Sequence, residues 1–193
     1  VENEGIILIE VDDVLEGGKA RHKKLMEQFY RQYTFGKRKR IMDEGDTGTL
    51  ISGRRVRQLK DYSFVWDMAD YADKHMKIIE APRGLLSSVE DLSDSMMSQV
   101  ETCNGQIGWL GGNGRPDVAA GHSIIAGEVK NKSPTLITNC NQCVKQVKSH
   151  KVQMRVWPIP PKDIRFVAWC DSSFDFSGRR HQQGWIIGAT NHY

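Results

Sequence analysis

Two adjacent carboxylates, Asp12 and Asp13, follow the largely apolar residues 6–11. Residues 14–15 resume the apolar run and residues 17–18 are both Gly, a pattern that predicts a β-hairpin with an acidic tip. Adjacent like charges repel, and each loses hydration beside an apolar strand. A divalent metal would offset this cost, and carboxylate oxygens suit Mg²⁺, which can clamp the oxygens of a phosphoryl displacement. Alternatively, the Asp pair is only a turn, because Asp favours turn positions.

A third carboxylate, Asp171, stands at the end of an alternating apolar stretch over residues 164–170. Residues 183–189 supply an antiparallel partner strand, and residues 177–180 lie in the connecting turn. Taken by itself, this pattern favours a strand-ending Asp of no special role.

Basic residues gather in two places, which are candidates for contact with phosphate groups. The first is Lys37, Arg38, Lys39 and Arg40, four consecutive cations that meet several phosphates or simply sit in water. The acidic residues in 43–46 follow, so we expect a surface loop or hairpin there. The second is the set of three arginines Arg54, Arg55 and Arg57, whose alternative role is that of exposed cross-strand charges.

The elements that must position these residues are predicted from periodicity and from helix-end signals. An amphipathic helix with a basic face is expected over 19–33, and a two-stranded hairpin from 50–59 and 63–66. A helix is expected to run from an Asp67 N-cap to residue 79, and a solvated linker or short helix over 84–98. Residues 111–114 predict a flexible break, and further expected segments are a helix opening at 115–117, a helix over 134–149 and a stiff connector over 157–161.

Composition limits the class of protein only weakly. The chain has 193 residues and 27 basic against 24 acidic side chains, so a net charge of +3 does not by itself indicate a nucleic-acid binder. No apolar run is long enough to span a bilayer, and the four cysteines have no disulfide-framework spacing, which suits a reducing compartment. Cys140, Cys143 and Arg115 are interpreted as structural residues.

These segments, taken in order, resemble the copia-type retrotransposon Pol polyprotein. The hydrophobic-Val-Asp-Asp-hydrophobic-Leu segment, with the Gly pair behind it, resembles the palm hairpin of reverse transcriptases. No single landmark is specific, but all of them occur in the family's order over nearly the whole chain: residues 50–56, 66–72, 108–110 with 115–117, and 168–173.

The resemblance implies an α+β fold with three parts. Residues 1–80 would be the C-terminal part of a reverse transcriptase palm, with its hairpin, and the start of the thumb. Residues 81–156 would be a helical thumb and connection. Residues 157–193 would be the opening β-hairpin of a ribonuclease H-like domain.

The resemblance also implies Mg²⁺-dependent nucleotidyl transfer and cleavage of RNA in RNA–DNA hybrids by the full-length protein. Asp12 and Asp13 would be metal ligands of the polymerase, and Asp171 would be the first metal-binding carboxylate of the nuclease. The arginines of 54–57 would grip the primer end. The implied partners are an RNA template, a DNA primer, an RNA–DNA hybrid and the rest of the Pol polyprotein, with no membrane.

Both implied active sites are incomplete in this chain, because the family takes further carboxylates from outside the segments present. We therefore expect this polypeptide alone neither to extend a primer nor to cleave a hybrid. The family usually has an aromatic residue where this chain has Glu10. The alternative function is a non-catalytic nucleic-acid-binding remnant of a decayed element. The expected location is intracellular, in a cytoplasmic virus-like particle, with the nucleus as an alternative.

Overall fold

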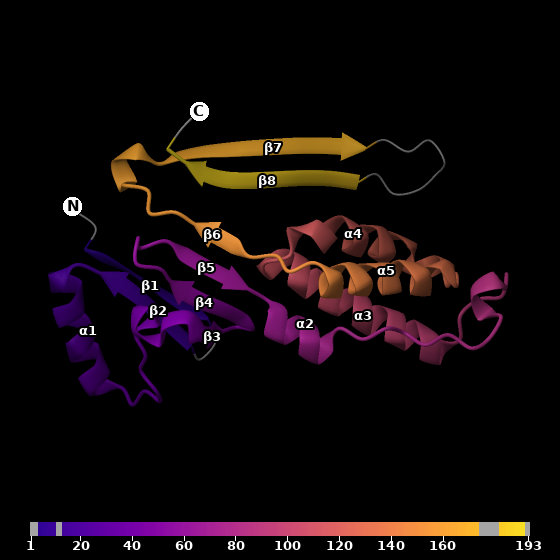
Figure 1. Ribbon diagram of the computed structural model, residues 1–193, viewed down its shortest axis with the longest axis horizontal. Helices are drawn as coiled ribbons and strands as arrows, with labels where there is room; N and C mark the ends of the chain where they lie inside the picture. The colour runs from indigo at the N-terminus through magenta and orange to yellow at the C-terminus, as the bar shows by residue number, and fades with distance from the viewer. Residues whose placement is uncertain (1–3, 11–12, 174–181, 192–193) are drawn as a thin grey trace.

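The computed structural model describes residues 4–10, 13–173 and 182–191. Helix accounts for 48% and strand for 24%, in small antiparallel sheets, which confirms the α+β class. Figure 1 shows an elongated molecule, with most of the strands at one end and the helices α2 to α5 at the other. No helix in the described ranges is long and apolar enough to cross a membrane.

The first hairpin has the strands that the apolar runs predicted. β1 (Gly5–Glu10) pairs antiparallel with β2 (Asp13–Gly18), in a register that runs from Gly5 opposite Gly18 to Glu10 opposite Asp13. The predicted amphipathic helix follows as α1 (Ala20–Gln32). It packs on the hairpin through the buried side chain of His22, whose Nε2 lies 2.8 Å from a carboxylate oxygen of Glu16.

The expected two-stranded hairpin over 50–66 is instead part of a four-stranded sheet in the order β3-β4-β5-β6. Its strands are β3 (Thr49–Ile51), β4 (Arg54–Gln58), β5 (Phe64–Asp67) and β6 (Met154–Val156). The prediction of one strand over 50–59 was wrong because the chain turns at Ser52 and Gly53. Both have positive φ, 47° and 79°, as a tight hairpin turn requires.

Four helices form the other end of the molecule: α2 (Ala69–His75), α3 (Asp94–Asn113), α4 (Ala119–Glu128) and α5 (Thr135–Ser149). The opening of a helical segment at Pro116 and the helix over 134–149 are confirmed. Short 3-10 helices occupy Ile41–Thr47, Leu85–Ser87, Pro116–Val118, Val129–Asn131 and Pro161–Asp163.

Two helix boundaries differ from the prediction, each for a tertiary reason. α2 ends at His75 rather than residue 79, and the Asn141 side chain binds both the N–H and the C=O of Ile79 in its place, at 2.8 and 3.0 Å. The N-cap of α2 is Met68 and not the predicted Asp67, which ends β5, although the Asp67 carboxylate accepts the N–H of Ala69 at 3.1 Å. α3 continues through most of the predicted Gly break and ends at Asn113, with Gly114 as its C-cap.

The main core lies among the helices. The Ser93 hydroxyl accepts the N–H of Met96 and caps α3, whose buried residues recur at helical spacing. α5 buries a matching stripe against it, and the core cluster extends from Met68 to Val147. Asn113, the last residue of α3, links this core to the sheet: its carbonyl accepts the indole N–H of Trp66 at 3.1 Å, and its side chain accepts a bond from Arg54.

The last two strands form a separate hairpin. β7 (Arg165–Ser173) pairs with β8 (Gln182–Thr190), as the alternating residues predicted, and β8 contacts α4. Trp169 lies opposite Ile186, and Cys170 lies opposite Trp185. Because successive pairs face opposite sides of a sheet, large apolar residues occur on both faces. Trp169 and Trp185 are 60% and 70% exposed.

Arg115 has the structural role that the sequence favoured. Only 4% of it is exposed, and its guanidinium binds both carboxylate oxygens of Asp117 at 2.8 Å. It also donates to the carbonyl of Val147 at the end of α5, at 3.0 Å. The hydrogen bonds from Arg115 hold the pKa of Asp117 below its usual range.

We predict that Arg115→Ala lowers the free energy of unfolding by about 1–3 kcal/mol, because it leaves the buried carbonyl of Val147 without its donor and removes the partner of Asp117. Arg40→Ala is the matched control, since the exposed Arg40–Asp43 pair at 3.9 Å should contribute about 0–1 kcal/mol. Denaturant unfolding measures both. Equal losses would contradict the structural role of Arg115.

The lowered pKa of Asp117 also gives this pair a pH dependence. The carboxylate contributes stability above its unfolded pKa of about 3.9, and that contribution is lost as the pH falls through the lower folded value. Wild type should therefore exceed Asp117→Asn in stability at pH 7, and the difference should shrink below about pH 4.

Candidate nucleic-acid interface

Of the predicted acidic tip, the structure describes Asp13, which belongs to the first hairpin. Asp13 is the first residue of β2 and stands opposite Glu10, the last residue of β1. Asp12 lies outside the described residues. The departure noted in the sequence, Glu10, is thus the register partner of a predicted metal ligand.

Asp171 lies near the end of β7, opposite Gly184 of β8. Its side chain is exposed, and Oδ1 accepts the N–H of Ser172 at 2.9 Å. Asp13 and Asp171 are on two separate two-stranded sheets. Within the ranges that the structure describes, no three His, Cys, Asp or Glu side chains converge in a way that could hold a metal ion.

The side chains of the four consecutive cations of 37–40 have different neighbours. Lys39 pairs with Glu44 at 2.6 Å, and Arg40 lies 3.9 Å from Asp43, so the acidic segment partly neutralises the run as its sequence suggested. The Arg38 guanidinium stacks 3.6 Å from the ring centroid of Tyr30. These three side chains therefore have partners within the protein, and all four residues remain exposed.

The arginines of β4 have closer partners. Arg55 donates to the Asp70 carboxylate through Nε at 2.7 Å and Nη2 at 2.5 Å. Arg57 pairs with Asp67 at 2.5 Å, and the Arg54 guanidinium binds the side-chain oxygen of Asn113. The positions predicted to contact phosphates are half-buried, and two of the three charges are balanced by Asp residues.

Beside Arg54 lies an aromatic group that the sequence analysis did not select. The rings of Tyr71 and His75 on α2 are 4.6 Å apart, and Tyr71 is 6.5 Å from the ring of Trp109 on α3. We call Arg54, Tyr71, His75 and Trp109 the aromatic surface. A Cβ added to Gly53 would lie 3.5 Å from Tyr71 and 3.7 Å from the Trp109 indole nitrogen, so the β3–β4 turn touches both rings.

Trp109 is 41% exposed although Ile107 and Leu110 beside it are fully buried. The sequence could have indicated Trp109 only as an aromatic residue on the exposed side of α3. That inference requires knowing which face of α3 packs on α5. Exposed rings next to cations can stack on nucleic-acid bases.

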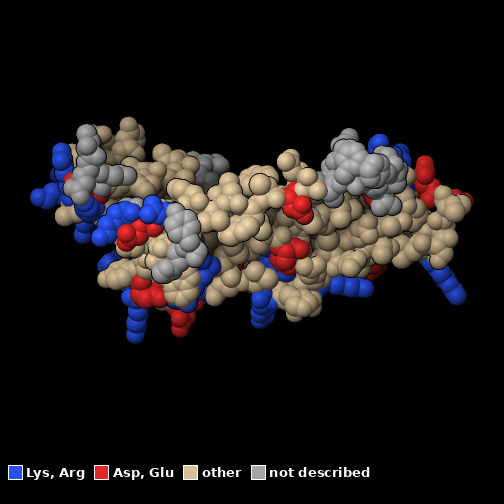
Figure 2. Space-filling model, turned by 90° about the horizontal axis from the view of Figure 1, so that it is seen from above, with Lys and Arg blue, Asp and Glu red and all other residues tan. Residues whose placement is uncertain are grey.

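Charge is unevenly distributed over the surface. Figure 2 shows Lys and Arg gathered at the end that carries α1 and the first hairpin, while the middle of this face has little charge. β7 and β8 expose several large apolar side chains, among them Phe166, Trp185 and Ile187.

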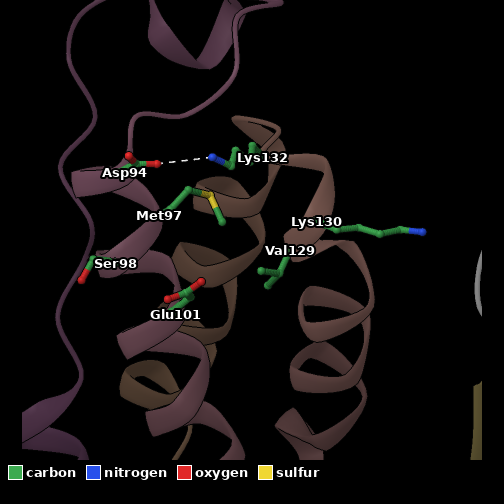
Figure 3. A pocket seen from close by; sticks show the side chains of 7 residues that line it. All are labelled: Asp94, Met97, Ser98, Glu101, Val129, Lys130 and Lys132. Carbon is green, nitrogen blue, oxygen red and sulfur yellow. Dashed lines mark hydrogen bonds and ion pairs between the residues drawn. The ribbon is translucent and has the colours of Figure 1, made fainter.

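Two shallow cavities lie on the surface, and Asp171 lines neither of them. One, of about 340 Å³, lies between α3 and the Val129–Asn131 turn; Figure 3 shows Asp94 paired with Lys132 at its rim and Lys130 pointing away. The other, of about 210 Å³, lies between the first hairpin and β3, with Leu8, Leu15 and Leu50 among its apolar lining and Lys37 and Lys39 beside them. Neither encloses a catalytic constellation.

Comparisons of the chain with models of protein families, with curated proteins and with solved structures found no match.

We predict that Asp70→Asn steepens the salt dependence of nucleic-acid binding by about one unit in log K against log salt, because it releases the Arg55 charge to a phosphate. Asp73→Asn is the matched control, since this exposed α2 carboxylate pairs with no cation in the described part of the chain. Fluorescence anisotropy with a labelled RNA–DNA hybrid measures both slopes. Identical slopes would contradict the masking of Arg55 by Asp70.

Proposed function

We propose that this chain is a fragment of a copia-type retrotransposon Pol polyprotein, from the reverse transcriptase palm, thumb and connection into a ribonuclease H domain. In the full-length protein the activities are Mg²⁺-dependent nucleotidyl transfer and cleavage of hybrid RNA. The observation that carries the proposal is the β1–β2 hairpin, which brings Glu10 and Asp13 opposite each other on either side of the Asp12 position. The rest of the family's landmarks follow it in order.

The residues at this tip suit the proposed metal. They offer carboxylate oxygens, which Mg²⁺ prefers over nitrogen or sulfur. Asp12 and Asp13 would hold the ion, and Asp171 would contribute to a second, separate site in the nuclease part. Bound Mg²⁺ would neutralise charge that develops on the reacting phosphate oxygens. The chain's own carboxylates would position the ion and stabilise its charge.

The composition of the C-terminal hairpin supports partnership with the rest of the polyprotein. Both faces of β7 and β8 expose large apolar side chains, as strands covered on both faces do. A two-stranded hairpin is marginal in water, so further strands and helices are expected to cover it. The proposed nucleic-acid partners are an RNA template, a DNA primer and the hybrid between them.

Sequencing the genomic DNA or transcript on both sides of this segment tests the proposal. An open frame that continues upstream to a strand bearing another Asp, and downstream to further acidic residues, is expected. Stop codons close to both ends would favour a decayed element instead.

We predict that, in the complete polyprotein, Asp13→Asn lowers primer extension by about 10³-fold and leaves hybrid cleavage nearly unchanged, because the two sites have separate metal ligands. Asp171→Asn should have the reverse effect. Both assays are made on one preparation, with Asp163→Asn as the control for loss of an acid near β7. Loss of both activities in either single variant would contradict the assignment of two sites.

The alternative function is that of a non-catalytic nucleic-acid-binding protein. The aromatic surface favours it, because it needs no carboxylate: Trp109 is exposed beside Arg54, and single-stranded nucleic acid stacks on such rings. The exposed cations of 37–40 would add contacts to phosphates. Binding without turnover in the complete polyprotein would distinguish this function from the enzyme.

We predict that Trp109→Ala weakens binding of a single-stranded oligonucleotide by about 5- to 100-fold, the loss expected for one stacked base. Trp157→Ala is the matched control, because Trp157 is also exposed but stacks on Arg155 at 3.5 Å, away from the aromatic surface. Anisotropy titrations and circular dichroism of both variants separate binding from folding. Equal affinities for the two variants would exclude stacking on Trp109.

A further inference from the structure

Three cysteines meet at the contact between α3 and α5. Cys103 lies on α3, and Cys140 and Cys143 lie one turn apart on α5. All three are buried free thiols, whereas Cys170 on β7 is exposed. The proposed nucleic-acid function uses none of these thiols, so they form a nucleophilic cluster with no assigned role.

The two α5 thiols point toward different helices. The Cys140 sulfur is directed at α3, where it lies 3.9 Å from the carbonyl oxygen of Val100, one turn before Cys103. The Cys143 sulfur is directed at α4, since a Cβ added to Gly121 would lie 2.5 Å from it. Cys140 is therefore the α5 thiol that faces Cys103.

The protonation of the pair is unequal. A hydrogen bond with the Cys140 thiol lowers the pKa of Cys103, against the effect of burial. The same hydrogen bond, together with burial, raises the pKa of Cys140. The lowered pKa favours Cys103 as the attacking group.

We propose that Cys103 and Cys140 are a reversible oxidation site that forms a disulfide between α3 and α5. The oxidant is a small-molecule disulfide such as glutathione disulfide. The Cys103 thiolate attacks one sulfur of the oxidant, forms a mixed disulfide and releases the first small thiol. Cys140 then gives up its proton and attacks the Cys103 sulfur, which releases the second small thiol. Two protein thiols are oxidised and one external disulfide is reduced to two thiols, which carry the two protons.

The burial of both thiols sets the conditions for this step. The oxidant can reach Cys103 only when the α3–α5 contact opens, so oxidation is slow compared with that of Cys170. Once formed, the disulfide closes the chain from Cys103 to Cys140 and restrains the unfolded state. The proposal does not depend on the proposed nucleic-acid function.

The test maps thiols in the whole chain after long incubation with glutathione disulfide. The protein is alkylated with iodoacetamide, digested without reduction and analysed by mass spectrometry. The Cys143→Ala variant is used beside wild type, because Cys140 and Cys143 fall in one tryptic peptide. A cross-link between Cys103 and Cys140 in both proteins is expected, with a rise in melting temperature of about 5–10 °C that a reductant reverses.

Other results would overturn the proposal. One is a cross-link from Cys103 to Cys143 in wild type. Another is that Cys103 and Cys140 stay free while exposed Cys170 has reacted fully. Cys140→Ala should give no cross-link to Cys103, and a cross-link in that variant would assign the site to Cys143. Fragmentation of the cross-linked wild-type peptide locates the alkylated cysteine, so wild type alone supplies the first two results even if a variant fails to fold.

Discussion

The end of α3 is the constraint on which the rest of the structure depends. At Asn113 the carbonyl binds Trp66 of the sheet, the side-chain oxygen binds Arg54, and the side-chain nitrogen binds the Trp109 carbonyl at 2.8 Å. Two residues later, buried Arg115 binds the end of α5. A short stretch thus fixes the four-stranded sheet against the helices. The bonds to Trp66, Arg54 and Val147 are half-buried or buried, so their donors and acceptors would be costly to leave unpaired.

This junction also determines which cations could meet a ligand. The β4 arginines look alike in sequence, but Arg55 and Arg57 are paired with the Asp residues at and just after the end of β5. Arg54 instead lies against the end of α3, beside Trp109. The aromatic surface is therefore a product of how the sheet and helices meet, and any nucleic acid that stacks on Trp109 would also approach Arg54.

Local patterns were enough to predict the elements whose signals lie within one segment. The two hairpins, α1 and α5 follow from apolar periodicity, and the α+β class follows from them. Tertiary contacts determine the other boundaries. The Asn141 side chain binds the backbone of Ile79, where the last turn of α2 was expected. Gly111 lies close to Ala119, where α3 was expected to break but remains helical. The site was harder to predict, because the partners that neutralise its arginines are distant in sequence, and a run of basic residues does not reveal them.

The last strand of the four-stranded sheet, β6, comes after the four helices in the sequence. β6 reaches β5 only after the chain has passed through α2, α3, α4 and α5, and it pairs through three residues, from Trp66 opposite Met154 to Phe64 opposite Val156. Pairing β6 with β5 closes a long loop, which costs conformational entropy. That cost is smaller once the helices between the two strands have packed, so β6 should pair late in folding. It is also the sheet's edge, so a pull on the chain beyond Val156 would detach β6 first and leave the helices intact.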